Sequence, residues 1–349
     1  MTRGPVRVSV FGKTDLGRTR DHNEDTFLVA DLSTGNASLQ PEVRCHEIGA
    51  RGSLFMVADG MGGAAAGELA SAMASDLIYK HMATAWATDV DASPERFAFR
   101  MREAVEFANQ QIHSYAYEHP DVRGMGTTVT AAGVHGGDLY LAQIGDSRAY
   151  LVRNGAAIQV TKDQSLMQRL VDAGELTEEE AEQSERRNII LQALGPDPRV
   201  KVDLTRQALR RGDTLIICSD GLSGLVRREE FSALTRKHAE LSDLCSALID
   251  LANERGGPDN ITVVAARFEG DGLPEPADAE GVGYSVYHLP DADPAEDQVT
   301  APATAAVAPP VATAPAPAAA GRASRERGRA LLLLAVVLCL IAALLAVWF

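Results

Sequence analysis

Four aspartates stand at ends of apolar runs that read as β-strands: Asp59, Asp146, Asp220 and Asp259. Asp59 closes the run that starts at Leu54, Asp220 closes the run that starts at Thr214, and a glycine follows each of these two acids. Acids in such places suit a metal site better than a core. Oxygen ligands without Cys or His select hard cations, Mg²⁺ or Mn²⁺ before Zn²⁺, and such ions activate water or hold phosphate.

Two further motifs carry groups that suit the same chemistry. Residues 20–25 place Arg20 ahead of two adjacent carboxylates, Glu24 and Asp25, at the start of a strand. An Arg fork fits phosphate oxygens, and nearby carboxylates bind a metal or its waters. Residues 58–63 combine Asp59 with three glycines, which let the backbone approach a ligand closely. Each motif alone also fits an ordinary turn or a surface ion-pair cluster, so their weight lies in their occurrence together.

The elements that must position these residues are runs of strands and pairs of helices. Strands are expected at residues 6–11, 26–30, 54–58, 127–134, 139–144, 149–152, 214–218 and 261–268. Helices are expected at residues 68–87, 94–118, 229–238 and 241–254. Glycines at 136–137 and 145 predict tight turns that join three successive strands into an antiparallel meander. The pattern favours an α+β architecture in which two sheets lie between helical layers.

In this order the motifs resemble a known family, the metal-dependent type 2C Ser/Thr protein phosphatases, over most of residues 6–268. The resemblance is carried by residues 15–17, 20–25, 59–63, 124–128, 145–148, 219–222 and 259–260. It implies a four-layer α-β-β-α sandwich, two antiparallel sheets flanked by helix pairs, with two Mn²⁺ or Mg²⁺ ions at one edge. The polar segment at about 163–195 would be the family's flap, which influences substrate selection.

The resemblance also implies ligand roles for the strand-end acids. Asp59 would bridge both ions, and the carbonyl of Gly60 would add a ligand to one of them. Asp220 and Asp259 would hold the other ion, and Asp146 with Asp220 would form a weaker third metal site.

The remaining implied roles belong to residues 20–25. Glu24 and Asp25 would order metal-bound waters or contribute to the site directly, and Arg20 would clamp the phosphate. The expected reaction is hydrolysis of phosphoserine and phosphothreonine by a water that the two metals activate, with no phosphoenzyme.

Two positions depart from the family's pattern. Met61, as in many bacterial members, stands where some members have a His assigned as general acid, so the leaving group must take its proton from water or another residue. His22 and His46 are candidates by sequence neighbourhood, although a surface or core role is the simpler interpretation of each. Gln164 stands where relatives often have His, and the sequence does not reveal what that change does.

The C-terminal segment, residues 269–349, predicts a membrane tether. The folded domain is expected to end near Phe268, followed by an acidic and then Pro/Ala-rich linker at 269–329. Residues 330–349 are continuously apolar and uncharged, long enough to span the hydrocarbon core, whereas a core helix usually keeps a polar stripe. Four arginines precede this stretch, which predicts a single-pass, tail-anchored protein with its catalytic domain in the cytoplasm.

The leading hypothesis is thus a bacterial Ser/Thr phosphatase at the cell membrane that acts on cytoplasmic phosphoproteins. Transmembrane Ser/Thr kinases and their substrates are the expected partners, by family analogy. The formal net charge of -15 argues against a nucleic-acid partner. The alternatives are an inactive phosphoprotein-binding module, or a phosphatase of the same fold for an anti-sigma-factor antagonist or a small phosphorylated substrate.

Overall fold

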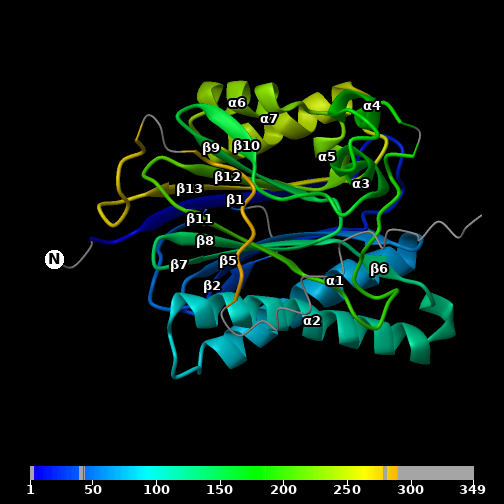
Figure 1. Ribbon diagram of the computed structural model, residues 1–349, viewed down its shortest axis with the longest axis horizontal. Coiled ribbons are helices and arrows are strands. Elements are labelled where there is room, and N and C mark those ends of the chain that lie inside the picture. Colours follow the sequence, from blue (N-terminus) through cyan, green and yellow to red (C-terminus); the bar gives the residue numbers. More distant parts are fainter. Residues whose placement is uncertain (1–3, 39–41, 43, 185, 278–280, 290–349) are drawn as a thin grey trace, which may run out of the picture. The chain divides into compact units, whose positions relative to one another are not determined.

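The computed structural model describes residues 4–38, 42, 44–184, 186–277 and 281–289. Two antiparallel sheets stack against each other in it, each with helices on its outer face (Figure 1). The first sheet has the order β10 (Ala156–Gln159), β9 (Arg148–Arg153), β12 (Thr214–Cys218), β13 (Ile261–Glu269), β1 (Arg7–Asp15) and β4 (Arg44–Glu47). The second has the order β11 (Asp203–Ala208), β8 (Asp138–Ile144), β7 (Val129–His135), β5 (Ser53–Met61), β2 (Asp25–Asp31) and β3 (Asn36–Ser38), and β6 (Gly126–Thr127) pairs with β5.

Helix pairs complete the layers. The second sheet is covered by α1 (Ala64–His81), which continues as a π-helical turn at Met82–Trp86, and by α2 (Pro94–Glu118). The first sheet is covered by α6 (Arg228–Lys237) and α7 (Leu241–Glu254). Helix α2 begins where the sequence predicts it, because Ser93 accepts the Arg96 N–H at 3.2 Å and Pro94 occupies the first helical position. The predicted sandwich of two antiparallel sheets with helices is confirmed.

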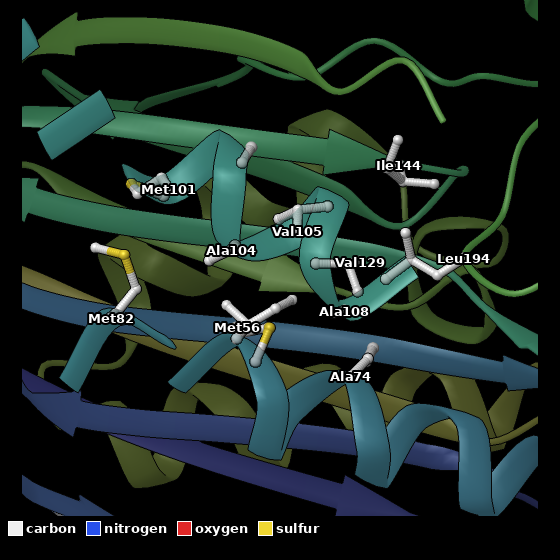
Figure 2. Close-up of a cluster of buried hydrophobic side chains, with 14 of the residues drawn as sticks. Met56, Ala74, Met82, Met101, Ala104, Val105, Ala108, Val129, Ile144 and Leu194 are labelled. Carbon is white, nitrogen blue, oxygen red and sulfur yellow. The ribbon is translucent and has the colours of Figure 1, made fainter. Parts of the chain in front are cut away.

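Three apolar layers hold these elements together, and β5 contributes to two of them. Phe55 and Val57 point between the two sheets, whereas Leu54 and Met56 point toward the helices. Figure 2 shows Met56 among side chains of α1 and α2, including Met101. Because side chains alternate along a strand, a strand covered on both faces is apolar throughout. This accounts for the unbroken apolar run that ends at Asp59.

The predicted meander is wrong in its third strand. β7 and β8 form a hairpin in the second sheet, but β9 lies in the first sheet, between β10 and β12. The chain therefore crosses between the sheets at residues 145–147, here called the Asp146 turn. Gly145 has φ 97°, and a Cβ there would lie 2.6 Å from the Thr128 side chain. Gly145, which in the sequence indicates a hairpin turn, therefore lies in the connection that crosses from one sheet to the other.

The folded body extends past the predicted boundary at Phe268. Residues 281–289 return to β11, where the Tyr287 N–H donates to the Leu204 carbonyl at 2.7 Å and the Leu289 side chain is buried. Among the described residues, no helix has both the length and the apolar character needed to cross a membrane. The predicted span at 330–349 and the linker from 290 onward lie outside the described residues.

Candidate metal centre

The predicted acids meet where the two sheets end side by side. Asp25 on β2 lies directly opposite Asp59 on β5 in the antiparallel register of the second sheet. Asp220, the first residue of α5 (Asp220–Ser223), directly follows Ser219, the residue after β12 of the first sheet. The Ser219 hydroxyl donates to Asp25 Oδ2 at 2.8 Å, which joins the two sheets at this point. Asp146 and Asp259 complete the cluster, since the charges of both raise the pKa of Asp59.

Burial and mutual repulsion make these carboxyl groups reluctant to ionise. Burial, with the charges of Asp220 and Asp259 acting in the same direction, raises the pKa of Asp25 to about 7. Burial and the charge of Asp220 raise the pKa of Asp146 to about 8. The pKa of Asp59 is raised well above its ordinary value by burial and by Asp25, and that of Asp220 is raised by burial and by Asp259.

The donor set fits divalent cations. Asp25 Oδ1 and Asp146 Oδ1 are buried without any hydrogen-bond partner, whereas buried polar atoms normally have one. As the side chains stand, no group of three or more His, Cys, Asp or Glu in the described residues is arranged to hold an ion. A hard cation entering among these oxygens would partner the orphaned atoms and offset the repulsion. Mn²⁺ or Mg²⁺ is therefore the expected occupant.

Glycine is required at two places beside the acids. The Gly60 N–H donates to the Glu24 carbonyl at 3.1 Å, and a Cβ on Gly60 would lie 2.2 Å from the Gly67 carbonyl oxygen. A Cβ on Gly67 would lie 2.0 Å from Glu24 Oε2, so the Glu24 side chain rests on this turn of α1. Gly60 was predicted to take part in the site, whereas Gly67 was not. The feature that could have indicated Gly67 is its position in the sequence, one helical turn after the Gly62-Gly63 pair.

Asn260 is an anchor whose role was not predicted, although residues 259–260 are among those that carry the resemblance. Its buried side chain accepts the Glu24 N–H at 2.9 Å and donates to the carbonyls of Leu16, at 3.0 Å, and His22, at 2.9 Å. These bonds hold residues 16–24 against Asp259. A buried Asn directly before a core strand is the sequence signal for such an anchor, because it must satisfy both its oxygen and its nitrogen.

Arg20 lies at the edge of the cluster and is already paired. Its Nη2 atom lies 2.8 Å from Asp259 Oδ2, and the two side chains are 49 % and 33 % exposed. The structure thus brings the predicted phosphate clamp next to a predicted metal ligand. Of the two candidate proton donors, His22 lies close enough to influence the pKa of Glu24, whereas His46 bonds Ser53 near the far ends of β1 and β5.

A cleft of about 1050 Å³ opens over the acids. Arg20, Asp146, Asp220 and Asp259 are among the residues that line it. The segment predicted as the flap also contributes lining residues, including some from the short helices α3 (Leu166–Asp172) and α4 (Glu178–Glu182). In Figure 1, α3, α4 and α5 gather at the same end of the sandwich. A phosphorylated side chain that enters this cleft would meet both the acids and Arg20.

Comparison with known proteins gives consistent results. A family model described as protein phosphatase 2C matches residues 38–253. The serine/threonine phosphatase stp of Listeria welshimeri is 38% identical over 253 residues, which is 72% of this chain and 92% of the relative. The serine/threonine protein phosphatase PstP of Mycobacterium tuberculosis is 36% identical over 266 residues, 76% of this chain but 46% of that protein.

Solved structures agree with the sequence matches. The crystal structure of the M. tuberculosis phosphatase PstP/Ppp has a TM-score of 0.63 at 35% identity, and the match covers 75% of this chain and 99% of that one. The catalytic domain of PstP in complex with two manganese ions has a TM-score of 0.61 at 34% identity, covering 76% and 99%. The sequence matches, the fold and the cluster of acids together show that this chain belongs to the protein phosphatase 2C family.

Proposed function

We propose that this protein removes phosphate from Ser and Thr side chains of cytoplasmic proteins while it is tethered to the cell membrane. Membership of the family shows that it is a metal-dependent Ser/Thr phosphatase. Its substrates, the roles of its site residues and its membrane tether are what we propose. The observation that carries the proposal is the set of buried, mutually repelling carboxyl groups at the cleft, with two orphaned oxygens and an arginine beside them.

Different residues of the chain would bind the metal ions and the phosphate. Asp59, the Gly60 carbonyl, Asp220 and Asp259 would hold two divalent cations, and Asp146 a third. Bound cations supply Lewis acidity, which makes water more acidic and offsets charge on the phosphoryl oxygens. Arg20 would exchange its ion pair with Asp259 for one with the phosphate, since its half-exposed side chain lines the cleft.

The two buried cysteines of the domain, Cys218 and Cys245, do not offer an alternative nucleophile. Burial raises the pKa of the Cys218 thiol, two residues before Asp220, to about 12. Burial raises the pKa of the Cys245 thiol to about 12 as well. Both thiols stay protonated at neutral pH, and the thiolate is the reactive form. Direct attack by water, without a phosphocysteine intermediate, is the consistent route.

Turnover of a phosphothreonine peptide tests the catalytic part. We expect phosphate release in Mn²⁺ or Mg²⁺, and none in excess chelator or in Asp59→Ala. The control is Asp76→Ala, which removes an exposed acid of α1 that forms an ion pair with Lys80. Full activity in chelator would refute metal dependence, and binding of the peptide without turnover would indicate a phosphoprotein-binding module.

The tether rests on the sequence beyond the described residues. Twenty uncharged apolar residues at 330–349 follow a linker with arginines at its end, which favours insertion with the catalytic domain in the cytoplasm. A tether raises the effective concentration of membrane-bound phosphoproteins, and transmembrane Ser/Thr kinases are the partners we propose. Membrane fractionation of the full chain and of a version ending at residue 329 tests this; equal recovery of both in the soluble fraction would refute it.

A further inference from the structure

Gln164, at the start of the flap, is bonded twice to the Asp146 turn. Its backbone N–H donates to the Gly145 carbonyl at 2.9 Å, and its side-chain Oε1 accepts the Gly145 N–H at 3.0 Å. The two bonds form a closed pair between one residue of the flap and one residue of the turn. This arrangement restricts rotation of the flap against the turn more than a single bond would.

The far end of the flap returns to the same residue. The Leu191 N–H donates to the Gln164 carbonyl at 2.7 Å, and the Leu166 N–H donates to the Ile189 carbonyl at 2.9 Å. Ser165 and Ile190 form an isolated antiparallel bridge between these bonds. The flap is therefore closed at its base, and Gln164 contacts its entry, its exit and the Asp146 turn.

An ion pair beside Gln164 braces the other side of the turn. Arg148 Nε lies 3.0 Å from each carboxylate oxygen of Asp163, and Arg148 Nη2 lies 2.7 Å from Oδ2. This bidentate geometry is among the stronger side-chain contacts. Asp146 thus lies between two contacts with the flap, Gly145 to Gln164 on one side and Arg148 to Asp163 on the other.

The core satisfies two carbonyls of the turn, whereas the first N–H of the turn bonds the flap. Buried Gln143 donates to the carbonyls of Gly145, at 3.1 Å, and Ser147, at 2.7 Å. For the Gly145 N–H the bond that the structure shows is the one to Gln164 Oε1. Since Gly145 holds φ 97°, the turn has an uncommon backbone conformation, and Gln164 supplies the contact that fastens it to the flap.

We propose that Gln164 is a positioning residue that fastens the Asp146 turn to the base of the flap. The flap base and the turn, which carries Asp146 into the cleft lining, then keep a fixed position relative to each other. This gives a role to the position where the sequence departs from its relatives. The structural part of the inference is independent of the proposed function, and only its kinetic part rests on phosphatase activity.

The test compares two glutamines at the flap base. Gln164 and Gln192 both contact the Lys201 backbone, but only Gln164 also bonds Gly145. Gln164→Met keeps the length of the side chain and removes its hydrogen bonds, Gln164→Glu keeps the acceptor, and Gln192→Met is the matched control. Amide hydrogen exchange of the metal-free proteins is measured in peptides that cover residues 143–147 and 189–192, together with the melting temperature.

We expect Gln164→Met to speed exchange in both peptides by about fivefold, the equivalent of one hydrogen bond, and Gln164→Glu to restore protection at 143–147. Gln192→Met should leave the 143–147 peptide unchanged. On a phosphothreonine peptide, Gln164→Met should lower kcat/KM by about fivefold, mainly through KM. Three results would each overturn the proposal: unchanged exchange at 143–147 in Gln164→Met, an equal change there in Gln192→Met, or faster exchange with unaltered kinetics on the phosphothreonine peptide. If no variant and no wild-type protein turns over the peptide, the exchange result still decides whether Gln164 fastens the turn.

Discussion

Strand β12 has an acid beside each of its ends, and the two acids have opposite surroundings. Asp213, before the strand, forms a bidentate ion pair with Arg153, with Nε to Oδ1 at 2.9 Å and Nη2 to Oδ2 at 2.7 Å. Both side chains are almost fully buried, at 1% and 5% exposure. Asp220, after the strand, lies among other carboxylates, and burial together with Asp259 raises its pKa. It has no direct ion pair within the described residues.

The difference separates an acid used for structure from an acid that we propose holds a ligand. A buried carboxylate with a fixed cation is neutralised within the chain, and removing either partner leaves an uncompensated charge. A partly buried carboxylate among like charges favours its protonated form or takes up a cation from outside. Variants at the two ends of β12 should therefore affect different properties, activity at one end and stability at the other.

The largest effect is expected from Asp220→Asn on activity. Loss of this proposed metal ligand should lower kcat on a phosphothreonine peptide by on the order of 10³-fold or more. The metal-free variant should be at least as stable as wild type, because one repelling carboxyl group is gone. Steady-state kinetics and urea unfolding measure the two quantities, and a variant with more than a tenth of wild-type activity would contradict the assignment.

The next effect is expected from Asp213→Asn on stability. Leaving Arg153 buried and unpaired should lower the free energy of unfolding by about 3–5 kcal/mol, while kcat per folded molecule stays close to wild type. The matched control is Asp138→Asn, which removes the partner of the more exposed Arg206 and should cost less than about 1 kcal/mol. Equal losses in the two variants would show that burial of the ion pair is not the deciding factor.

The metal-free protein should lose stability as the pH rises from about 5.5 to 7.5. The pKa of Asp25 is about 7 and that of Asp146 about 8 in the folded chain, against 3.8 for an unperturbed Asp. In this window the folded state holds protons that the unfolded state has released, so the free energy of unfolding falls by about 1.4 kcal/mol per pH unit for each such proton. Below about pH 4 both states are protonated and this contribution stops changing.

Urea unfolding across this pH range measures the slope. Mn²⁺ should reduce it, since the cation replaces the protons, and Asp25→Asn should reduce it in the metal-free protein. Asp213→Asn should leave it unaltered. A stability that is flat or rises between about pH 5.5 and 7.5 without metal would contradict the raised pKa values of Asp25 and Asp146.

The smallest effect is expected from Arg20→Lys. Lys keeps the charge but loses the planar fork, so KM for a phosphothreonine peptide should rise by about tenfold, with a smaller change in kcat. The exposed ion pair with Asp259 contributes little to stability, and the melting temperature should stay close to wild type. An unchanged KM would mean that Arg20 does not contact the phosphate.

The sequence was informative about interior strands and silent about edges. All eight predicted strands correspond to strands of the structure, and helices α2 and α7 have the predicted bounds. The four strands that were not predicted, β3, β4, β10 and β11, are the outermost strands of the two sheet orders. An edge strand has a neighbour on one side only and is partly exposed, so it lacks the apolar run on which such predictions depend.

The candidate site shows the same division. Asp59 and Asp220 were found because each stands at the end of a buried apolar run, and their place at the ends of interior strands follows from that run alone. No roles could be given from the sequence to Asn260, Gly67 and Gln164. Each of them acts through contacts with residues distant in the sequence, or through close approach to backbone atoms that only packing brings near. The sequence carries no local trace of such contacts.

By itself the sequence determined which acids stand at the ends of apolar strands and where the interior strands and helices α2 and α7 run, because periodicity and residue type are local properties. Only the tertiary structure decided that β9 leaves β8 for the other sheet, that residues 281–289 return to β11, and that Gln164 joins the flap to the Asp146 turn. These features depend on which distant segments pack together, and that choice minimises buried unpaired polar groups across the whole domain.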